Sequence, residues 1–129
     1  MDKHLVFVYG SLRRGNAHSM SVRFPDAKFI ADATVSGSLY DLGAYPGLLL
    51  GESNSTVTGE VYEVDGELLN QLDDFEASSN YFRKQVELSV GTDRKLAWIY
   101  APDHDAEFYS ERTLITSGDW MEYAKTKPE

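Results

Sequence analysis

The 129-residue sequence contains no cysteine, which excludes disulfide bonds, thiolate nucleophiles and cysteine-ligated metal sites. Basic residues are also scarce. The sequence has 12 Lys and Arg residues and 21 Asp and Glu residues, so its net charge is −9. Nucleic-acid backbones and anionic membrane surfaces attract Lys and Arg, so this balance argues against either partner. No apolar run approaches the length that crosses a bilayer, and no apolar leader precedes the first expected strand. We therefore expect a soluble, cytoplasmic protein.

Two common types of catalytic centre are also missing from the sequence. The three histidines, His4, His18 and His104, lie far apart and show no metal-ligand spacing, so no metal site is expected. Ser11 lacks the second glycine of a G-x-S-x-G nucleophile elbow. A nucleophilic or metal-assisted mechanism is therefore not favoured by any motif.

What the sequence does contain is enough apolar material for one substantial core. Hydrophobic residues make up 42% and aromatic residues 12% of the chain, which is typical of a globular domain. We find no internal repeat and no linker. The sequence predicts a single domain over residues 1–124, followed by a frayed tail at residues 125–129.

Short apolar segments separated by glycine-rich turns dominate the hydrophobic pattern. They predict strands near residues 5–9, 27–40, 48–50, 57–64, 81–90 and 95–100. One helix is expected from a cap at Asp65 to about Glu76, and a short closing helix near residues 117–123. Residues 16–23 fit a loop or a short helix, and residues 108–115 are ambiguous. This order favours an α+β fold, a small closed or nearly closed mixed β-barrel with flanking helices.

The first expected strand runs directly into a loop formed by Tyr9, Gly10, Ser11 and Leu12. Gly10 has no Cβ, so another chain or a ligand can approach its backbone closely. The amides of Gly10, Ser11 and Leu12 can point at an anionic group. Most strand–Gly–Ser segments are ordinary turns, and the loop alone does not decide between a turn and a binding site.

Glu76 lies on the apolar face of the expected mid-chain helix, where a charged side chain is unusual. With Leu68 at the origin of a helical wheel, Leu72 lies at about 40°, Leu69 at about 100° and Glu76 at about 80°. The carboxylate therefore falls inside the apolar stripe, where it is costly unless it is paired, protonated or exposed in a cavity.

Three interpretations of Glu76 remain open at this point. The helix can end early and leave the side chain in water, or the carboxylate can pair with Arg83 or Lys84. The third interpretation is a proton-transfer carboxylate at the mouth of the barrel, whose pKa is raised by desolvation.

Several short segments, in order and covering nearly the whole chain, resemble the γ-glutamylcyclotransferase-like family, close to its γ-glutamylaminecyclotransferase and AIG2-like branch. The segments are Tyr9–Asn16, Gly37–Gly43 with Tyr45–Gly47, Val57–Tyr62, Leu72–Glu76, Tyr81–Arg83 and Ser117–Trp120. Each segment is unspecific by itself, whereas the ordered set is specific.

The resemblance implies a small mixed β-barrel and a cofactor-independent enzyme. A γ-glutamyl amine or γ-glutamyl amino acid would be cyclised to 5-oxoproline with release of the free amine. It also implies that Tyr9, Gly10, Ser11 and Leu12 hold the γ-glutamyl head group and that Glu76 is the catalytic acid/base. Ala77 departs from the family, in which glycine often follows this glutamate.

Two other functions fit parts of the sequence. The first is a non-catalytic small-molecule-binding or adaptor protein on the same barrel, because a fold alone does not establish an activity. The second is a nucleic-acid-binding barrel, which the shortage of basic residues argues against. The identity of the γ-glutamyl compound is left open, since a γ-glutamyl amino acid, a γ-glutamyl-ε-lysine isopeptide and an acyl-antibiotic intermediate share the same head group.

Overall fold

The structure of the chain is a computed structural model that describes residues 3–10, 12–13, 19–43, 46–51, 55–78, 80–102, 104 and 106–126. Its elements follow one another in the order β1 (Lys3–Val8), α1 (Met20–Arg23), β2 (Lys28–Asp41), β3 (Pro46–Leu50), β4 (Thr56–Asp65), α2 (Gly66–Ala77), β5 (Tyr81–Val90), β6 (Asp93–Pro102), α3 (Ala106–Tyr109), β7 (Thr113–Leu114) and α4 (Trp120–Thr126).

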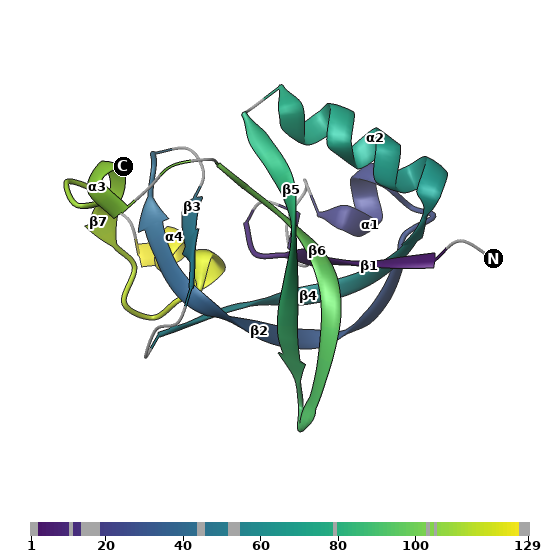
Figure 1. Cartoon of the computed structure of the whole chain (residues 1–129), viewed down its shortest axis with the longest axis horizontal. Helices are drawn as coiled ribbons and strands as arrows, with labels where there is room; N and C mark the ends of the chain where they lie inside the picture. The colour runs from purple at the N-terminus through teal and green to yellow at the C-terminus, as the bar shows by residue number, and fades with distance from the viewer. Residues whose placement is uncertain are drawn as a thin grey trace.

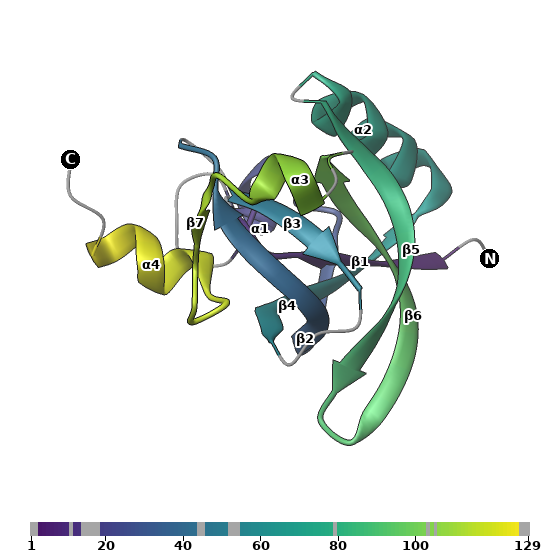
Figure 2. The same cartoon turned by 60° about the vertical axis from the view of Figure 1, so that its left-hand side comes forward.

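Five of the strands close into a mixed β-barrel, in the order β2, β4, β1, β6 and β5 (Figures 1 and 2). The pairing of Thr34 in β2 with Ser89 in β5 completes the circle. Strands β1 and β6 are parallel, and the other barrel pairs are antiparallel. Strands β3 and β7 extend the sheet by pairing with β2. The predicted α+β fold with a closed mixed barrel is confirmed.

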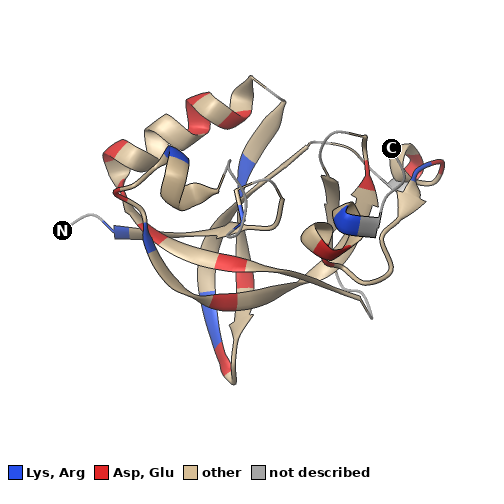
Figure 3. Ribbon diagram, turned by 180° about the vertical axis from the view of Figure 1, so that it is seen from behind, with Lys and Arg blue, Asp and Glu red and all other residues tan. Residues whose placement is uncertain are grey.

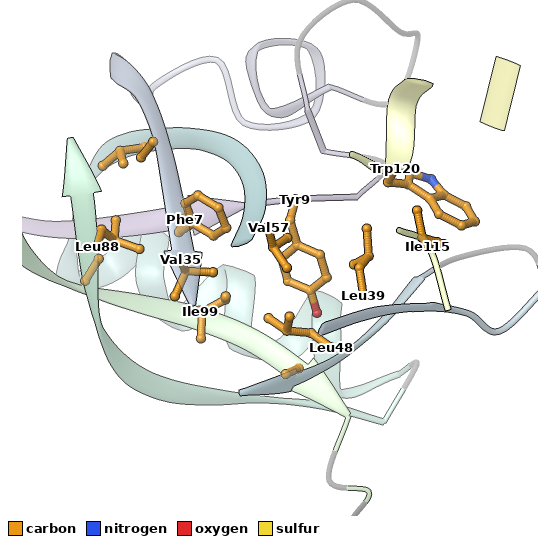
Figure 4. Packing of buried hydrophobic residues seen from close by; sticks show 14 residues of the cluster. Phe7, Tyr9, Val35, Leu39, Leu48, Val57, Leu88, Ile99, Ile115 and Trp120 are labelled. Carbon is orange, nitrogen blue, oxygen red and sulfur yellow. The ribbon is translucent and has the colours of Figure 1, made fainter. Parts of the chain in front are cut away.

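The second half of strand β1, residues 6–8, is buried on both faces, as the apolar sequence from Leu5 to Tyr9 predicts. Phe7 belongs to the cluster that fills the barrel interior, and Tyr9, the residue after the strand, continues on the same side (Figure 4). Val6 and Val8 point to the opposite side and join a second cluster outside the barrel. The side chains alternate because successive residues of a strand face opposite sides.

Helix α2 covers this outer face of the barrel (Figure 1). It begins where the Asp65 carboxylate accepts a hydrogen bond of 2.8 Å from the Leu68 amide, which is the expected N-cap. The apolar stripe of Leu68, Leu69 and Leu72 is buried in the outer cluster. The helix ends at Ala77, one residue beyond the predicted end.

Glycine at position 59 brings β4 close to β1. A Cβ on this residue would lie 2.1 Å from the Val8 carbonyl oxygen, so a larger side chain would force the two strands apart. The end of β1, from which the Gly10 loop departs, is therefore held closely against β4.

The C-terminal part of the chain packs at the other side of the molecule from α2 (Figures 1 and 2). The segment of ambiguous pattern forms helix α3 and strand β7. Helix α4 inserts Trp120 into the interior cluster. It runs to Thr126 and so includes two residues of the expected tail; residues 127–129 lie outside the described part of the chain. Acidic residues are spread over helices and strands alike (Figure 3).

Candidate active site

A cavity of about 120 Å³ opens where β1 ends. Its walls come from the end of β1 and the following loop, from the start of β3, from the last turn of α2 and from β5 and β6. The lining residues are Phe7, Val8, Tyr9, Gly10, Leu12, Pro46, Phe75, Glu76, Tyr81 and Tyr100. Tyr9, Gly10, Leu12 and Glu76, all predicted from the sequence, thus lie around one cavity, whereas Ser11 lies outside the described residues.

Glu76 occupies the last turn of α2 and lines this cavity. Burial raises the pKa of its carboxyl group to about 7. Arg83, one of its possible partners, instead forms an ion pair with Asp73, with 3.4 Å between the Arg83 Nε and Asp73 Oδ1 atoms. Within the described part of the chain we find no ion pair or hydrogen bond of the Glu76 carboxyl group. The salt-bridge interpretation is therefore wrong. The interpretation in which the helix ends before Glu76 is wrong as well, because α2 continues to Ala77 and the half-buried Glu76 lines the cavity.

Three tyrosines fix the aromatic walls of the cavity through their hydroxyl groups. Tyr9 donates a hydrogen bond of 2.7 Å to the carbonyl oxygen of Tyr100, and Tyr100 donates one of 2.6 Å to Asp73. The Tyr81 hydroxyl donates a hydrogen bond to the Pro46 carbonyl oxygen. This bond joins β5 to β3 at the cavity. Burial raises the pKa values of the Tyr9 and Tyr100 phenols, so both stay neutral at physiological pH.

Gly10 forms the side of the cavity next to Pro46. A Cβ on Gly10 would lie 3.1 Å from Pro46 Cγ and 3.2 Å from Pro46 Cδ, so this backbone and the proline ring are already in close contact. The Gly10 carbonyl accepts a bond of 3.1 Å from the Arg13 amide, and the Leu12 carbonyl accepts one of 2.7 Å from the Met20 amide. The carbonyl groups of Gly10 and Leu12 are thus already bonded within the protein.

Sequence reasoning located part of this site and missed the rest. It did not assign Tyr81 or Tyr100 to this cavity, although Tyr81 lies in one of the segments that resemble the family. It did not include Pro46 or Phe75, because apolar side chains carry no signal that separates a cavity wall from a core. Among the described residues we find no group of His, Asp and Glu that could hold a metal ion. In the same part of the chain, no helix has the length and apolar character needed to span a bilayer.

A known family model matches nearly the whole chain. The model of gamma-glutamyl cyclotransferase, AIG2-like, matches residues 6–122 of the sequence. The chain belongs to this family. The resemblance identified from the short segments is thereby confirmed.

Relatives of this γ-glutamyl cyclotransferase family match almost the full length of the chain. It is 36% identical over 123 residues to the gamma-glutamylcyclotransferase family protein YtfP of Escherichia coli K12, covering 93% of this chain and 98% of that protein. It is also 36% identical over 129 residues to the gamma-L-glutamyl-butirosin B gamma-glutamyl cyclotransferase of Niallia circulans, covering 92% of this chain and 76% of that protein.

A solved structure of the family has the same architecture. The mouse AIG2-like protein superimposes with a TM-score of 0.73 and 26% sequence identity, over 93% of this chain and 89% of that chain. The barrel and its flanking helices are therefore the family fold.

Proposed function

We propose that this chain converts a γ-glutamyl amine or γ-glutamyl amino acid to 5-oxoproline and the free amine. The observation that carries the proposal is the shared cavity, in which the Glu76 carboxyl group and the Gly10 backbone line the same small space. Family membership supports the reaction class, and the printed name of the Niallia circulans relative describes a γ-glutamyl cyclotransferase.

The reaction joins two groups of one substrate. The α-amino nitrogen attacks the γ-carbonyl carbon, a C–N bond closes the five-membered lactam, and the C–N bond to the leaving amine breaks. No water is consumed. Because the attack is intramolecular, holding the substrate in the ring-closing conformation supplies a large part of the rate enhancement. A small cavity with rigid aromatic walls is suited to this task.

Glu76 would move the protons. The α-ammonium group gives up two protons as it becomes the lactam nitrogen, and the leaving nitrogen takes up two as it becomes an ammonium group. Glu76 would accept the first proton from the α-amino group and return it to the leaving nitrogen. A carboxyl group whose pKa is about 7 accepts and releases protons readily near neutral pH.

The loop from Tyr9 to Leu12 would bind the γ-glutamyl head group. The half-buried backbone at Gly10 lines the cavity and offers a close approach without a side chain, and amide groups in such a turn stabilise a carboxylate or a developing oxyanion. Ser11 belongs to this proposed binding segment by its position in the sequence. Tyr9 and Leu12 would contribute apolar contacts, since both are buried at the cavity wall.

A product assay tests the function directly. The purified protein is incubated with a γ-glutamyl amine, a γ-glutamyl amino acid and a γ-glutamyl-ε-lysine isopeptide, and 5-oxoproline is measured by mass spectrometry. We expect release from at least one compound, and a loss of about 10²–10⁴-fold in the Glu76→Gln variant, which is the range of general acid–base catalysis.

Two results would contradict the proposal. Binding of these compounds without release of 5-oxoproline would establish the alternative of a non-catalytic binding protein on the same barrel. Equal turnover by the wild-type protein and by Glu76→Gln would remove Glu76 from the mechanism. A correctly folded variant, verified by circular dichroism, is the condition for either conclusion.

A further inference from the structure

Arg13 connects the loop after β1 to two distant parts of the chain. Its Nε atom lies 2.8 Å from Glu60 Oε2, and its Nη1 atom lies 2.6 Å from Asp119 Oδ1. Glu60 belongs to β4, and Asp119 directly precedes α4. One guanidinium group therefore joins segments that are 47 and 106 residues away in sequence.

The three charged side chains form a partly buried network. The side chains of Arg13, Glu60 and Asp119 are 12%, 4% and 24% exposed. Burial lowers the pKa of Arg13, but its bonds to Glu60 and Asp119 outweigh this effect and raise it. Ion pairs at such sites are stronger than on an open surface, because water screens them less. The planar guanidinium group, with several N–H donors in fixed directions, suits two carboxylates at once.

Both carboxylates are themselves attached to β4. Glu60 is a residue of that strand and lies on the same face as Tyr62 of the outer cluster. Asp119 follows Gly118, whose carbonyl oxygen accepts a hydrogen bond of 2.8 Å from the Thr58 amide of β4. The Arg13 side chain is thus held against one rigid strand.

The backbone of Arg13 is in turn bonded to the cavity wall. Its amide donates the 3.1 Å hydrogen bond to the Gly10 carbonyl that closes the loop. Gly10 lines the cavity that also contains Glu76. The position of Arg13 is therefore coupled to that of Gly10, the residue proposed to bind the substrate, by this hydrogen bond as well as by the short chain between them.

We propose that Arg13 is a positioning residue that fixes the Gly10 backbone relative to β4, and that Glu60 and Asp119 act on the site through it. The expected change in KM rests on the proposed function. The expected effect of the network on the Gly10 backbone does not depend on that function. The network does not contact the substrate in this proposal. Its effect is on the binding of the γ-glutamyl head group by the Gly10 backbone, so we expect KM to change more than kcat.

A double-mutant cycle tests this inference. The variants are Arg13→Lys, which keeps the charge but loses the two-pronged geometry, Glu60→Gln, which keeps the shape but loses the charge, and the double variant. We expect each single variant to raise KM about tenfold with kcat within about twofold of wild type, and the double variant to add little beyond either one. Asp119→Asn is expected to change KM in the same direction.

A second measurement does not depend on turnover. Hydrogen exchange of the Arg13 amide, followed by NMR, reports the bond to the Gly10 carbonyl. We expect this exchange to accelerate about tenfold in Glu60→Gln, although that substitution lies in another strand. The matched control is Glu87→Gln, which breaks an Arg–Glu pair of the same 2.8 Å length on the exposed β5–β6 hairpin and should change neither KM nor this exchange rate.

The outcomes separate the inference from the proposed function. If the wild-type protein releases no 5-oxoproline, the proposed function fails, and the exchange measurement still decides the role of Arg13. If Arg13→Lys raises KM while Glu60→Gln and Asp119→Asn leave both KM and exchange unchanged, Arg13 binds the substrate directly and the positioning role is wrong. Fully additive changes in KM, or a lower melting temperature with unchanged KM and exchange, would also overturn it.

Discussion

The carboxyl group of Glu76 has a higher pKa than an ordinary glutamate because of where it lies. A solvated glutamate is ionised at neutral pH, whereas burial in the cavity wall raises the pKa of Glu76 to about 7. The neighbouring Asp73 receives the Tyr100 hydroxyl bond and the Arg83 ion pair, although it lies only one turn away on the same helix. The difference between the two carboxylates is one of surroundings, and it supports the proton-transfer role that we propose for Glu76.

The first prediction at this scale concerns the pH dependence of activity. Because Glu76 must be ionised to accept a proton, we expect kcat/KM to fall as pH decreases through about 7, the pKa of this group in the free protein. The profile is measured from pH 5 to 9 with one γ-glutamyl substrate. The residual activity of Glu76→Gln should lack this limb. A limb unchanged in that variant would assign it to another group.

The second prediction concerns stability. Between pH about 4.5 and about 7 the folded protein keeps the Glu76 proton, whereas the unfolded chain has lost it. Stability therefore falls as pH rises through this range, in contrast to an ordinary ion-paired carboxylate. The unfolding free energy of Glu76→Gln minus that of wild type should therefore increase by on the order of 2–3 kcal/mol from pH 4.5 to pH 8.

Urea denaturation at both pH values measures this difference. Asp74→Asn is the matched control, since Asp74 is an exposed carboxylate on the same helix, and it should change the unfolding free energy by less than about 0.5 kcal/mol. A Glu76→Gln difference that does not depend on pH would contradict the expected burial of the carboxyl group.

At the scale of elements, the site depends on the junction of β1 with its loop. The strand is held against β4 at Gly59, the loop turns at Gly10 against Pro46, and α2 brings Glu76 from the other side. Each element is anchored by the apolar clusters, so the cavity is formed by the packing of secondary structure around it.

The prediction at this scale is that side chains at Gly10 block the cavity in proportion to their size. A Cβ would already contact Pro46 at 3.1 Å, and the methyl groups of valine extend further. Gly10→Val should raise KM by at least about tenfold, and Gly10→Ala should have a smaller effect. Steady-state kinetics of both variants measures the change. Unaltered KM in Gly10→Val would exclude the loop from substrate binding.

At the scale of the whole molecule, two apolar clusters lie on the two sides of the barrel wall, one inside the barrel and one outside it. The interior cluster includes Trp120 from α4, and Trp98 of β6 packs against the outer cluster beneath α2. Since every barrel strand pairs with two others in the closed circle, neither cluster can be lost without opening the wall that supports the other.

We therefore predict that the chain unfolds as one cooperative unit, as expected for a single domain over residues 1–124. The Trp98→Phe variant leaves Trp120 as the fluorescent reporter of the interior, and Trp120→Phe leaves Trp98 as the reporter of the outer layer. In each variant, the urea midpoints from fluorescence and from far-UV circular dichroism should coincide. Midpoints that separate would indicate two units of independent stability.

The sequence by itself determined the elements and their faces. The unbroken apolar run of β1, the alternation in β4 and the stripe of α2 are local patterns, and local patterns fix which side chains a strand or helix presents to each side. They placed Glu76 on the buried face of its helix, and the ordered motifs indicated the family. Segments without such a pattern, such as residues 108–115, stayed undecided because their structure depends on contacts with β2.

Only the tertiary structure decided which residues from other parts of the chain lie next to these elements. It places Glu76 and Gly10 around one cavity, pairs Asp73 with Arg83, and joins Arg13 to Glu60 and Asp119. The sequence analysis did not single out Glu60, because no local pattern shows that its carboxylate meets the side chain of Arg13. Such pairs form between residues that are close in space and distant in sequence, and the packing of the loops and helices on the closed barrel sets those distances.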